Sequence, residues 1–214
     1  MKARHCSVAA GEELIAEGQT NSALYTLYDG WAMRVRTLPN GARQILDFVL
    51  PGDLIGLPSA LLGSSASSVQ ALTAITVCKL DPNRFATLLH AQHSLGLDLL
   101  KARIDDQERA DSRLVLLGRL GAQERLGYLL LELRKRLRAR GLFRGRSDAL
   151  PLHRVHLADA VGLSRIHVLR AMRALRERGL AVLVGRVLTI PSERRLARFS
   201  GYPLTLAATR QPIL

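Results

Sequence analysis

Several kinds of residue are scarce in this 214-residue chain, and each scarcity argues against a class of protein. Two cysteines are too few for the disulfide framework of a secreted protein. No run approaches the roughly 18 apolar residues of a membrane span, and no apolar segment follows the charged N-terminus. Aromatic residues are only 4% of a chain that is 48% hydrophobic, so the core must be largely aliphatic. We therefore expect a cytoplasmic protein with no membrane partner.

The motifs of common enzyme classes are also missing. The sequence contains no P-loop, no G-x-S-x-G turn, no H-E-x-x-H and no C-x-x-C. Cys6 and Cys78 are far apart, so we predict neither an iron–sulfur cluster nor a metal site. Cys78 is interpreted as a small residue in a strand, and His5-Cys6 as a disordered N-terminus that binds nothing. We predict no enzyme and no cofactor.

Positive charge is concentrated in the second half of the chain. Residues 1–98 hold 7 Lys/Arg and 8 Asp/Glu, a net charge of −1, whereas residues 99–214 hold 24 and 10, a net charge of +14. A bias in base composition would spread arginine evenly, which is not observed. A neutral first half and a basic second half are typical of a protein that binds nucleic acid through its C-terminal part.

The first half has the pattern of short antiparallel strands. Turn dipeptides recur about 11 residues apart, at Asp29-Gly30, Asn40-Gly41 and Pro51-Gly52. Apolar and polar residues alternate between these turns, as on half-buried strands. Residues 56–68 are small, polar and irregular, which fits either a plain loop or a ligand-binding cassette.

A long helix is predicted from Leu95 to Arg119. Its inner stripe has the spacing of a coiled-coil seam, interrupted in the middle by two polar residues. The spacing fits equally a homodimer seam and a helix that packs on the β-structure of its own chain. The stripe consists of Leu97, Leu100, Ile104, Gln107, Asp111 and Leu114.

Residues 152–191 carry the strongest local signal. A short helix fits Arg154 to Val161, Gly162 can adopt the left-handed angles of a tight turn, and Ser164 can cap a second helix that ends near Arg178. One face of the second helix is apolar and the other is basic. The apolar face comprises Val168, Ala171, Met172 and Leu175, and the basic face Arg165, Ile166, Leu169, Arg170 and Arg173.

A hairpin follows this pair of helices. Two short apolar runs, Leu180 to Val184 and Val187 to Ile190, are joined by Gly185-Arg186. The order helix, turn, helix and hairpin is that of a winged helix-turn-helix, whose second helix is sized to enter a major groove. Arg186 at the tip of the wing can reach a DNA phosphate.

In this order, the motifs resemble those of the CRP/FNR family of bacterial regulators over nearly the whole chain. The segments that carry the resemblance are Gly11–Gly18 (GEELIAEG), Leu24–Gly30 (LYTLYDG), Pro51–Gly56 (PGDLIG), Leu157–Arg165 (LADAVGLSR), Val168, Arg170 and Gly179-Leu180. The resemblance implies a homodimer that places two recognition helices in successive major grooves of double-stranded DNA. It also implies RNA polymerase as a partner.

Residue roles carry over from the family unevenly. Arg165 and Arg170 match arginines that read base edges, commonly guanine. Ile166 stands where many members have a base-reading glutamate, so only an apolar contact, such as one to a thymine methyl, is available. Four residues match positions that contact phosphate, namely Ser164, His167, His153 and Arg154.

The sensor half departs further from the family. Members that bind cyclic AMP have a Gly-Glu pair and an Arg-Ser pair around the phosphate, whereas this chain has Gly56-Leu57 and Ser65-Ala66. The positions that contact adenine fall at Ala110 and Asp111. Because a cyclic phosphate would lack a charged partner, we predict no tight binding of cyclic AMP and leave the effector unknown.

These observations lead to an α+β fold prediction with an antiparallel β-roll or jelly roll, a long dimerisation helix and a winged helix-turn-helix. The predicted boundaries are 1–94 for a cyclic-nucleotide-binding-like sensor, 95–120 for the helix and 121–214 for the DNA-binding domain. The predicted function is that of a sequence-specific transcription regulator. The alternatives are a non-specific basic DNA-binding protein, a signalling module that binds acidic protein, and a redox- or haem-based gas sensor of the same family.

Overall fold

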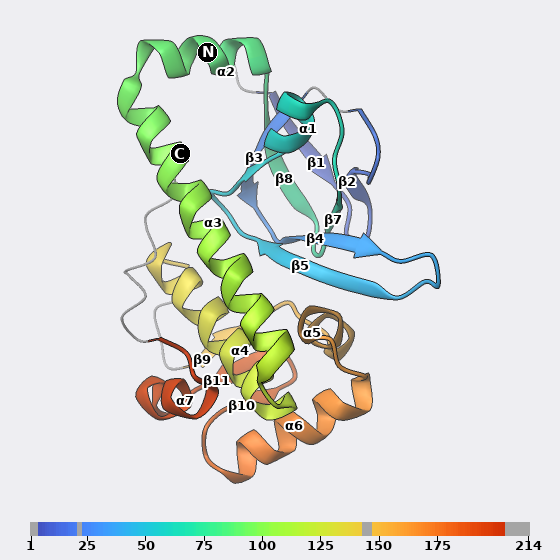
Figure 1. The fold of residues 1–214 in the computed structure, drawn as a ribbon, viewed down its shortest axis with the longest axis vertical. Helices are drawn as coiled ribbons and strands as arrows, with labels where there is room; N and C mark the ends of the chain where they lie inside the picture. The colour runs from blue at the N-terminus through green and yellow to red at the C-terminus, as the bar shows by residue number, and fades with distance from the viewer. Residues whose placement is uncertain (1–3, 21–22, 143–146, 204–214) are drawn as a thin grey trace. The chain divides into compact units, whose positions relative to one another are not determined.

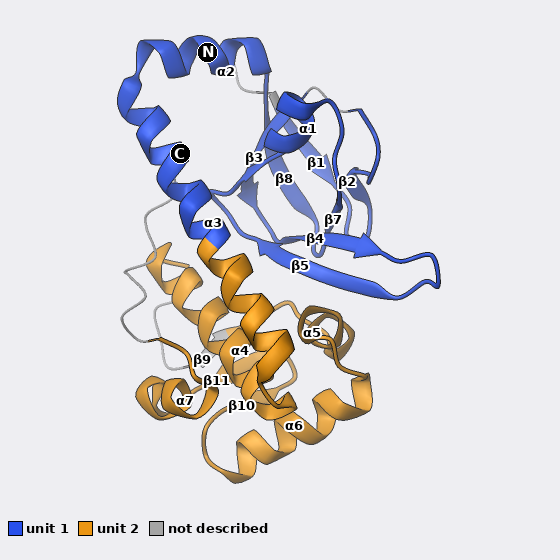
Figure 2. Ribbon diagram, viewed as in Figure 1, with its two compact units in different colours: residues 1–107, 212–214 blue, residues 108–211 orange. Residues whose placement is uncertain are grey.

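The computed structural model describes residues 4–20, 23–142 and 147–203 (Figure 1). The chain divides into two compact units, one that includes residues 1–107 and one of residues 108–211 (Figure 2). None of the helices in the described ranges is long and apolar enough to span a membrane. Within the same ranges, no three His, Cys, Asp or Glu side chains are grouped so that they could hold a metal ion.

The described part of the first unit contains two four-stranded antiparallel sheets. Their orders are β1-β8-β3-β6 and β2-β7-β4-β5. Aliphatic side chains such as Leu27, Val69 and Val77 are buried in the core of this unit. The strands are β1 (Arg4–Val8), β2 (Glu13–Ile15), β3 (Leu24–Asp29), β4 (Ala32–Thr37), β5 (Arg43–Val49), β6 (Leu54–Ile55), β7 (Ser68–Ala71) and β8 (Ile75–Leu80).

The predicted turns separate these strands. Gly30, between β3 and β4, has a φ of +84°, and a Cβ atom there would lie 2.3 Å from the carbonyl oxygen of Ala74. Only glycine fits this close approach of two backbone segments. The antiparallel strands predicted from the turn spacing, and the β-roll that the family resemblance implied, are confirmed.

For the first unit, the plain-loop alternative for residues 56–68 and the prediction of a disordered N-terminus were wrong. Part of the segment 56–68 is helical. The helix α1 (Leu57–Leu62) begins directly after Gly56. Buried Ser59 donates a hydrogen bond to the Gly56 carbonyl and holds this turn. His5 and Cys6 are not in a disordered terminus but in β1, where His5 lies opposite Cys78 of β8, with 3.6 Å between Nδ1 and Sγ.

Two helices follow the sheets. Asp81 caps α2 (Pro82–Ala91) by accepting hydrogen bonds from the backbone N–H groups of Asn83 and Arg84. The long helix α3 (His93–Arg119) begins in the first unit and ends in the second. The apolar residues of its predicted seam are 48% to 71% exposed. Leu97, Leu100 and Ile104 therefore leave about half of their surface open to solvent.

The second unit is built around α4 (Ala122–Ala139), which packs against α5 (Arg154–Val161), α6 (Arg165–Glu177) and α7 (Glu193–Ser200). Buried leucines, including Leu126, Leu130 and Leu133, fill its core. The wing is a three-stranded sheet of order β10-β11-β9, formed by β10 (Val182–Val184), β11 (Val187–Thr189) and β9 (Ser147–Ala149). The hairpin was predicted, whereas β9 and α7 were not.

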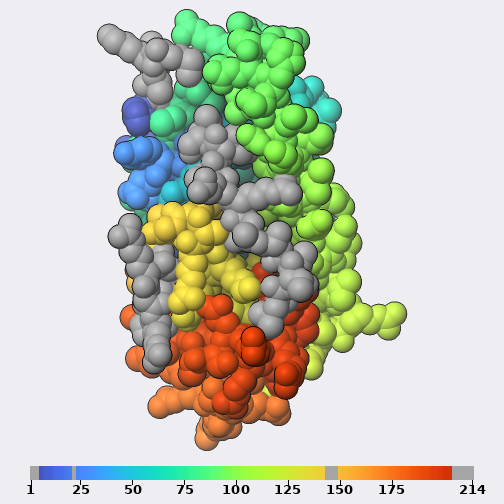
Figure 3. Space-filling view, turned by 90° about the vertical axis from the view of Figure 1, so that its left-hand side faces the viewer, coloured from blue at the N-terminus to red at the C-terminus, as the bar shows by residue number. Residues whose placement is uncertain are grey.

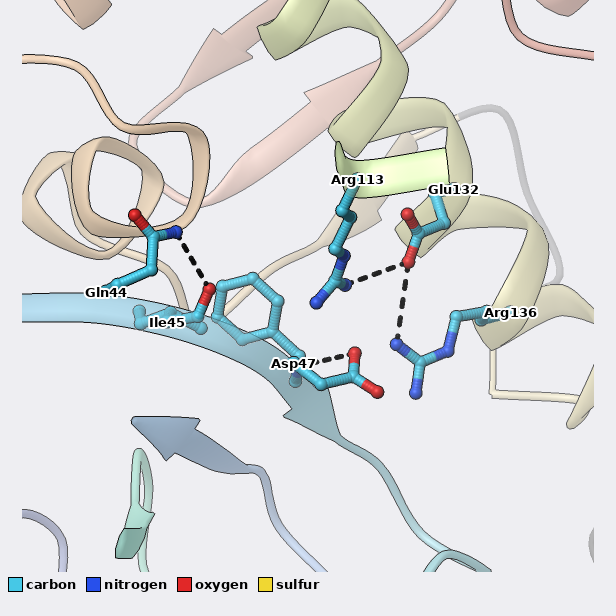
Figure 4. A network of polar contacts seen from close by, with 7 residues as sticks. Gln44, Ile45, Asp47, Arg113, Glu132 and Arg136 are labelled. Atoms are coloured by element: carbon cyan, nitrogen blue, oxygen red, sulfur yellow. Dashed lines mark hydrogen bonds and ion pairs between the residues drawn. The ribbon is translucent and has the colours of Figure 1, made fainter. Parts of the chain in front are cut away.

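Buried ion pairs join the helices of this unit. The carboxylate of Glu132 lies 3.0 Å from Nη2 of Arg113 and 3.8 Å from Nη1 of Arg136, which is only 2% exposed (Figure 4). Glu193 of α7 forms ion pairs with Arg134 and Arg138 of α4. Glu132 of α4 therefore joins α3 to this helix, and Arg134 and Arg138 near the end of α4 join α7 to it.

Candidate nucleic-acid interface

The sequence builds the helix-turn-helix through two local devices. Gly162 ends α5 with left-handed backbone angles, φ 64° and ψ 41°. Residues with a Cβ atom rarely adopt these angles, so glycine is favoured here. Two residues later, Ser164 begins α6 by accepting a hydrogen bond on Oγ from the backbone N–H of His167, at 3.3 Å. Together they confirm the turn and the cap inferred from the sequence.

The two faces of α6 differ as predicted. Val168, Ala171 and Leu175 are buried in the core of the unit. The opposite face is exposed and consists of Arg165, Ile166, Leu169, Arg170 and Arg173, with Ile166 64% exposed. A helix that buries one face and presents arginines on the other has the form required to enter a major groove.

The arginines of this face differ in what they contact. Arg173 is paired with Glu177 one turn later, with 2.9 Å between Nε and Oε1. Within the described part of the chain, the side chains of Arg165 and Arg170 form no ion pair or hydrogen bond. These two guanidinium groups retain all their donors for a base edge or a phosphate.

The residues predicted to contact phosphate lie at the starts of the two helices and on the wing. His153 is the N-cap of α5, Arg154 is its exposed first residue, and Arg186 occupies the turn between β10 and β11. Nη2 of Arg186 lies 3.2 Å from Nε2 of His153. Because arginine can only donate, Nε2 of His153 is the acceptor if this contact is a hydrogen bond. Oγ of Ser164 lies 2.8 Å from Nδ1 of His167.

Sequence reasoning missed His156 in this group. Its Nδ1 accepts a hydrogen bond from the backbone N–H of His153, at 3.1 Å. The sequence contained a signal for this contact. His153 and His156 are three residues apart, as are the N-cap and N3 residues that form the reciprocal contacts of a capping box. His156 thus fixes the start of α5 beside the wing.

Comparisons with known proteins agree with this geometry. A model of the cyclic nucleotide-binding domain matches residues 5–92, and a model of the Crp-like helix-turn-helix domain matches residues 124–199. The nitrogen fixation regulation protein FixK of Bradyrhizobium diazoefficiens is 31% identical over 183 residues, which cover 85% of this chain and 75% of FixK. The chain belongs to the CRP/FNR family of transcription regulators. It is a DNA-binding regulator of the FNR/FixK type.

Other similar proteins support the assignment to the CRP/FNR family. The transcriptional activatory protein AadR of Rhodopseudomonas palustris is 32% identical, over 85% of this chain and 75% of that protein. The structure of FixK2 from Bradyrhizobium japonicum is similar with a TM-score of 0.83 and 26% identity, over 93% of this chain and 98% of that one. The relatives are transcription regulators and not enzymes.

The family's effector positions can now be located in this regulator. Gly56 has a φ of +89° before α1, and Leu57 is the first residue of that helix. Ser65 donates a hydrogen bond to the Ser67 carbonyl at 2.6 Å, and Ala66 is exposed. Ala110 and Asp111 lie on the part of α3 that belongs to the second unit, and both are exposed. Neither Leu57 nor Ala66 offers a charge to a cyclic phosphate. That this regulator does not bind cyclic AMP tightly stays a prediction.

Proposed function

We propose that this regulator binds a near-palindromic operator as a homodimer, with α6 of each copy in one of two successive major grooves. The observation that carries the proposal is the outer face of α6. It presents Arg165 and Arg170, without partners in the described chain, directly after a capped N-terminus. Recognition helices of this class contact base edges with their N-terminal residues.

Four residues of this face have a proposed role. Arg165 and Arg170 form bidentate contacts to guanine, each worth roughly 1–3 kcal/mol of discrimination. Ile166 offers only an apolar side chain, which suits a thymine methyl group. Arg173 reaches the DNA after release from Glu177, a pair so exposed that its loss costs little.

The phosphate contacts position the protein without reading sequence. Ser164 and His167 lie at the start of α6, and His153 and Arg154 at the start of α5. Arg186 extends the same set to the wing. The proximity of Arg186 and His153 supports a single phosphate contact made by both.

The dimer is proposed on the exposed stripe of α3. Leu97, Leu100, Ile104 and Leu114 leave apolar surface open to solvent at coiled-coil spacing. A second copy of the same helix would cover this stripe. The 95–120 segment thereby keeps a function of its own as the dimerisation helix, although structurally it belongs to both compact units.

The remaining partners follow from the family. We propose that the operator-bound dimer contacts RNA polymerase in the cytoplasm, as befits a relative of proteins named transcriptional activators. An effector, if one controls the dimer, is proposed to act through the sensor segment that contains Gly56, Leu57, Ser65 and Ala66, together with Ala110 and Asp111 on α3.

The deciding experiment is selection of binding sites from a random double-stranded DNA pool by the purified protein. We expect enrichment of an inverted repeat whose half-site centres are about 10–11 bp apart. Arg170→Ala should weaken binding to the selected site by about 1–3 kcal/mol and change non-specific binding little. Arg84→Ala removes an equal charge from exposed α2 and should change neither.

Two outcomes would contradict the proposal. Binding without enrichment, both with and without cell extract as a source of effector, would indicate a non-specific basic protein whose affinity comes from phosphates alone. Equal losses on specific and random DNA in Arg170→Ala would indicate that this arginine contacts phosphate and reads no base.

A further inference from the structure

A hollow of about 650 Å³ lies in the second unit, between the end of α6 and the face of α7. Its volume falls within the range of about 300–1,000 Å³ typical of sites for small ligands. Figure 3 shows the second unit from one side, with its last described segments in red next to α4 in yellow. The hollow is lined by Arg178, Leu180, Ser192, Arg194, Arg195, Arg198 and Phe199.

The positive charge around this hollow is not balanced by nearby carboxylates. Arg194, Arg195 and Arg198 are exposed, and their guanidinium groups form no ion pair or hydrogen bond within the described residues. The two acidic side chains next in sequence are engaged elsewhere. Glu193 is paired with arginines of α4 and Glu177 with Arg173. Four arginines around one concave site create a positive potential that attracts anions.

The hollow also has an apolar side. Leu180 is buried, and the half-buried ring of Phe199 lies 5.1 Å from the guanidinium carbon of Arg178. Aromatic rings and guanidinium planes are the surfaces on which nucleobases stack. Guanidinium groups match phosphate oxygens in bidentate geometry. The site therefore combines groups for a planar ring with groups for several phosphates.

We propose that this hollow binds a nucleoside polyphosphate, with its phosphates on Arg194, Arg195 and Arg198 and its base against Phe199 and Arg178. The charge density favours this class over an acidic peptide. A polyphosphate gathers three or four negative charges in one small volume, whereas side-chain carboxylates are spread along an extended chain at about 3.3 Å per residue.

This site is distinct from the residues that read DNA. Arg178 is the C-cap of α6 and Ser164 its N-cap. The 13 helical residues between them correspond to about 20 Å along the helix axis. Binding at the hollow can therefore be measured without DNA, and its failure would leave the proposed operator binding untouched.

The test uses the full-length protein and a fluorescent mant derivative of ATP, followed by anisotropy. We expect saturable binding of the mant derivative. Unlabelled ATP should displace it, inorganic triphosphate should displace it only at higher concentration, and adenosine should not displace it. The double variant Arg194→Ala/Arg198→Ala should lose at least about tenfold in affinity, because contacts between guanidinium and phosphate are lost. Its circular dichroism spectrum and operator binding should be unchanged.

Two further variants separate specific from diffuse binding. Arg176→Ala removes one positive charge, against two in the double variant, from an exposed position of α6 outside the hollow, and should change the affinity by less than about twofold. Phe199→Leu should weaken binding of mant-ATP and leave competition by triphosphate intact.

Three results would overturn the proposal. Absence of saturable binding would exclude the ligand class. An equal loss in Arg176→Ala would show attraction to a basic surface without a site. A double variant that binds mant-ATP normally but loses operator affinity would assign these arginines to the DNA interface instead.

Discussion

The buried carboxylate of Glu132 offers the sharpest test of what holds the DNA-binding unit together. It lies between Arg113 of α3 and Arg136 of α4, at 3.0 and 3.8 Å. The substitution Glu132→Gln keeps the shape of the side chain and one acceptor oxygen but removes the charge. Both guanidinium groups then remain in the protein interior without this counter-charge.

The size of the effect follows from burial. Removal of one partner from a buried ion pair costs about 3–5 kcal/mol, because the remaining charge is left uncompensated. Glutamine can still accept a hydrogen bond from Arg113, so we expect the lower end, a loss of about 3 kcal/mol in the free energy of unfolding. For a unit of this size, each kcal/mol lowers the melting temperature by about 4–8 °C, which gives a decrease of about 12 °C or more.

The two units can be followed by different signals in one urea titration. The single tryptophan, Trp31, lies in the first unit, whereas the second unit is mainly helical and dominates the circular dichroism at 222 nm. We expect Glu132→Gln to shift the helical transition to lower urea. Fluorescence of Trp31 reports whether the unfolding transition of the first unit shifts to lower urea as well.

The matched control is Glu177→Gln in the same unit. Glu177 also pairs with an arginine, but both side chains are more than 60% exposed. Exposed pairs of this kind contribute about 0–1 kcal/mol. If Glu132→Gln cost no more than this control, the argument that burial makes the Glu132 network strong would be refuted.

Four further outcomes follow from the structure. Ile104→Asp places a charge in the exposed stripe of α3 and should convert dimers into monomers in sedimentation equilibrium; an unchanged dimer would place the contact elsewhere. Ser164→Ala removes a helix cap and should lower the free energy of unfolding by about 1 kcal/mol in urea denaturation. Ser164→Asp should keep the cap and still weaken operator binding, since its carboxylate would face phosphates; full affinity would contradict the phosphate role. Burial raises the pKa of Tyr128 and of Tyr202. Their protonated forms therefore stabilise the fold fully below the unfolded-state pKa of about 10, and this stabilisation is lost as the pH rises through the higher folded-state pKa. Melting temperatures measured between about pH 8 and 12 should fall above pH 10, and less steeply in Tyr202→Phe.

The parts of the fold that local chemistry specifies were predictable from the sequence. The turn at Gly162, the cap at Ser164 and the alternation of buried and exposed residues on α6 depend on neighbours a few residues apart. The same holds for the turn at Gly30, although the close approach of Ala74 that requires glycine there is visible only in the structure.

The parts that were missed depend on distant residues. β9 is three residues long and is a strand because it pairs with β11, whose sequence lies about 40 residues further on. The buried positions of Arg134 and Arg136 follow from carboxylates, including Glu193, on other turns and helices. α1 is a single short helix among serines and glycines, where composition predicts a loop. In the candidate site, the pairing of His153 with Arg186 likewise joins residues 33 apart in sequence.

The short strand β9 also constrains the order in which the DNA-binding unit can form during synthesis. Ala149 pairs with Val187, so α5, the turn and α6 lie within a loop that is closed at its base by the wing sheet. A growing chain cannot close this loop until residues up to 189 have left the ribosome, and Glu193 must follow before its ion pair with Arg134 can form. The helix-turn-helix is thus completed late, when nearly all of the unit that supports it is available to fold.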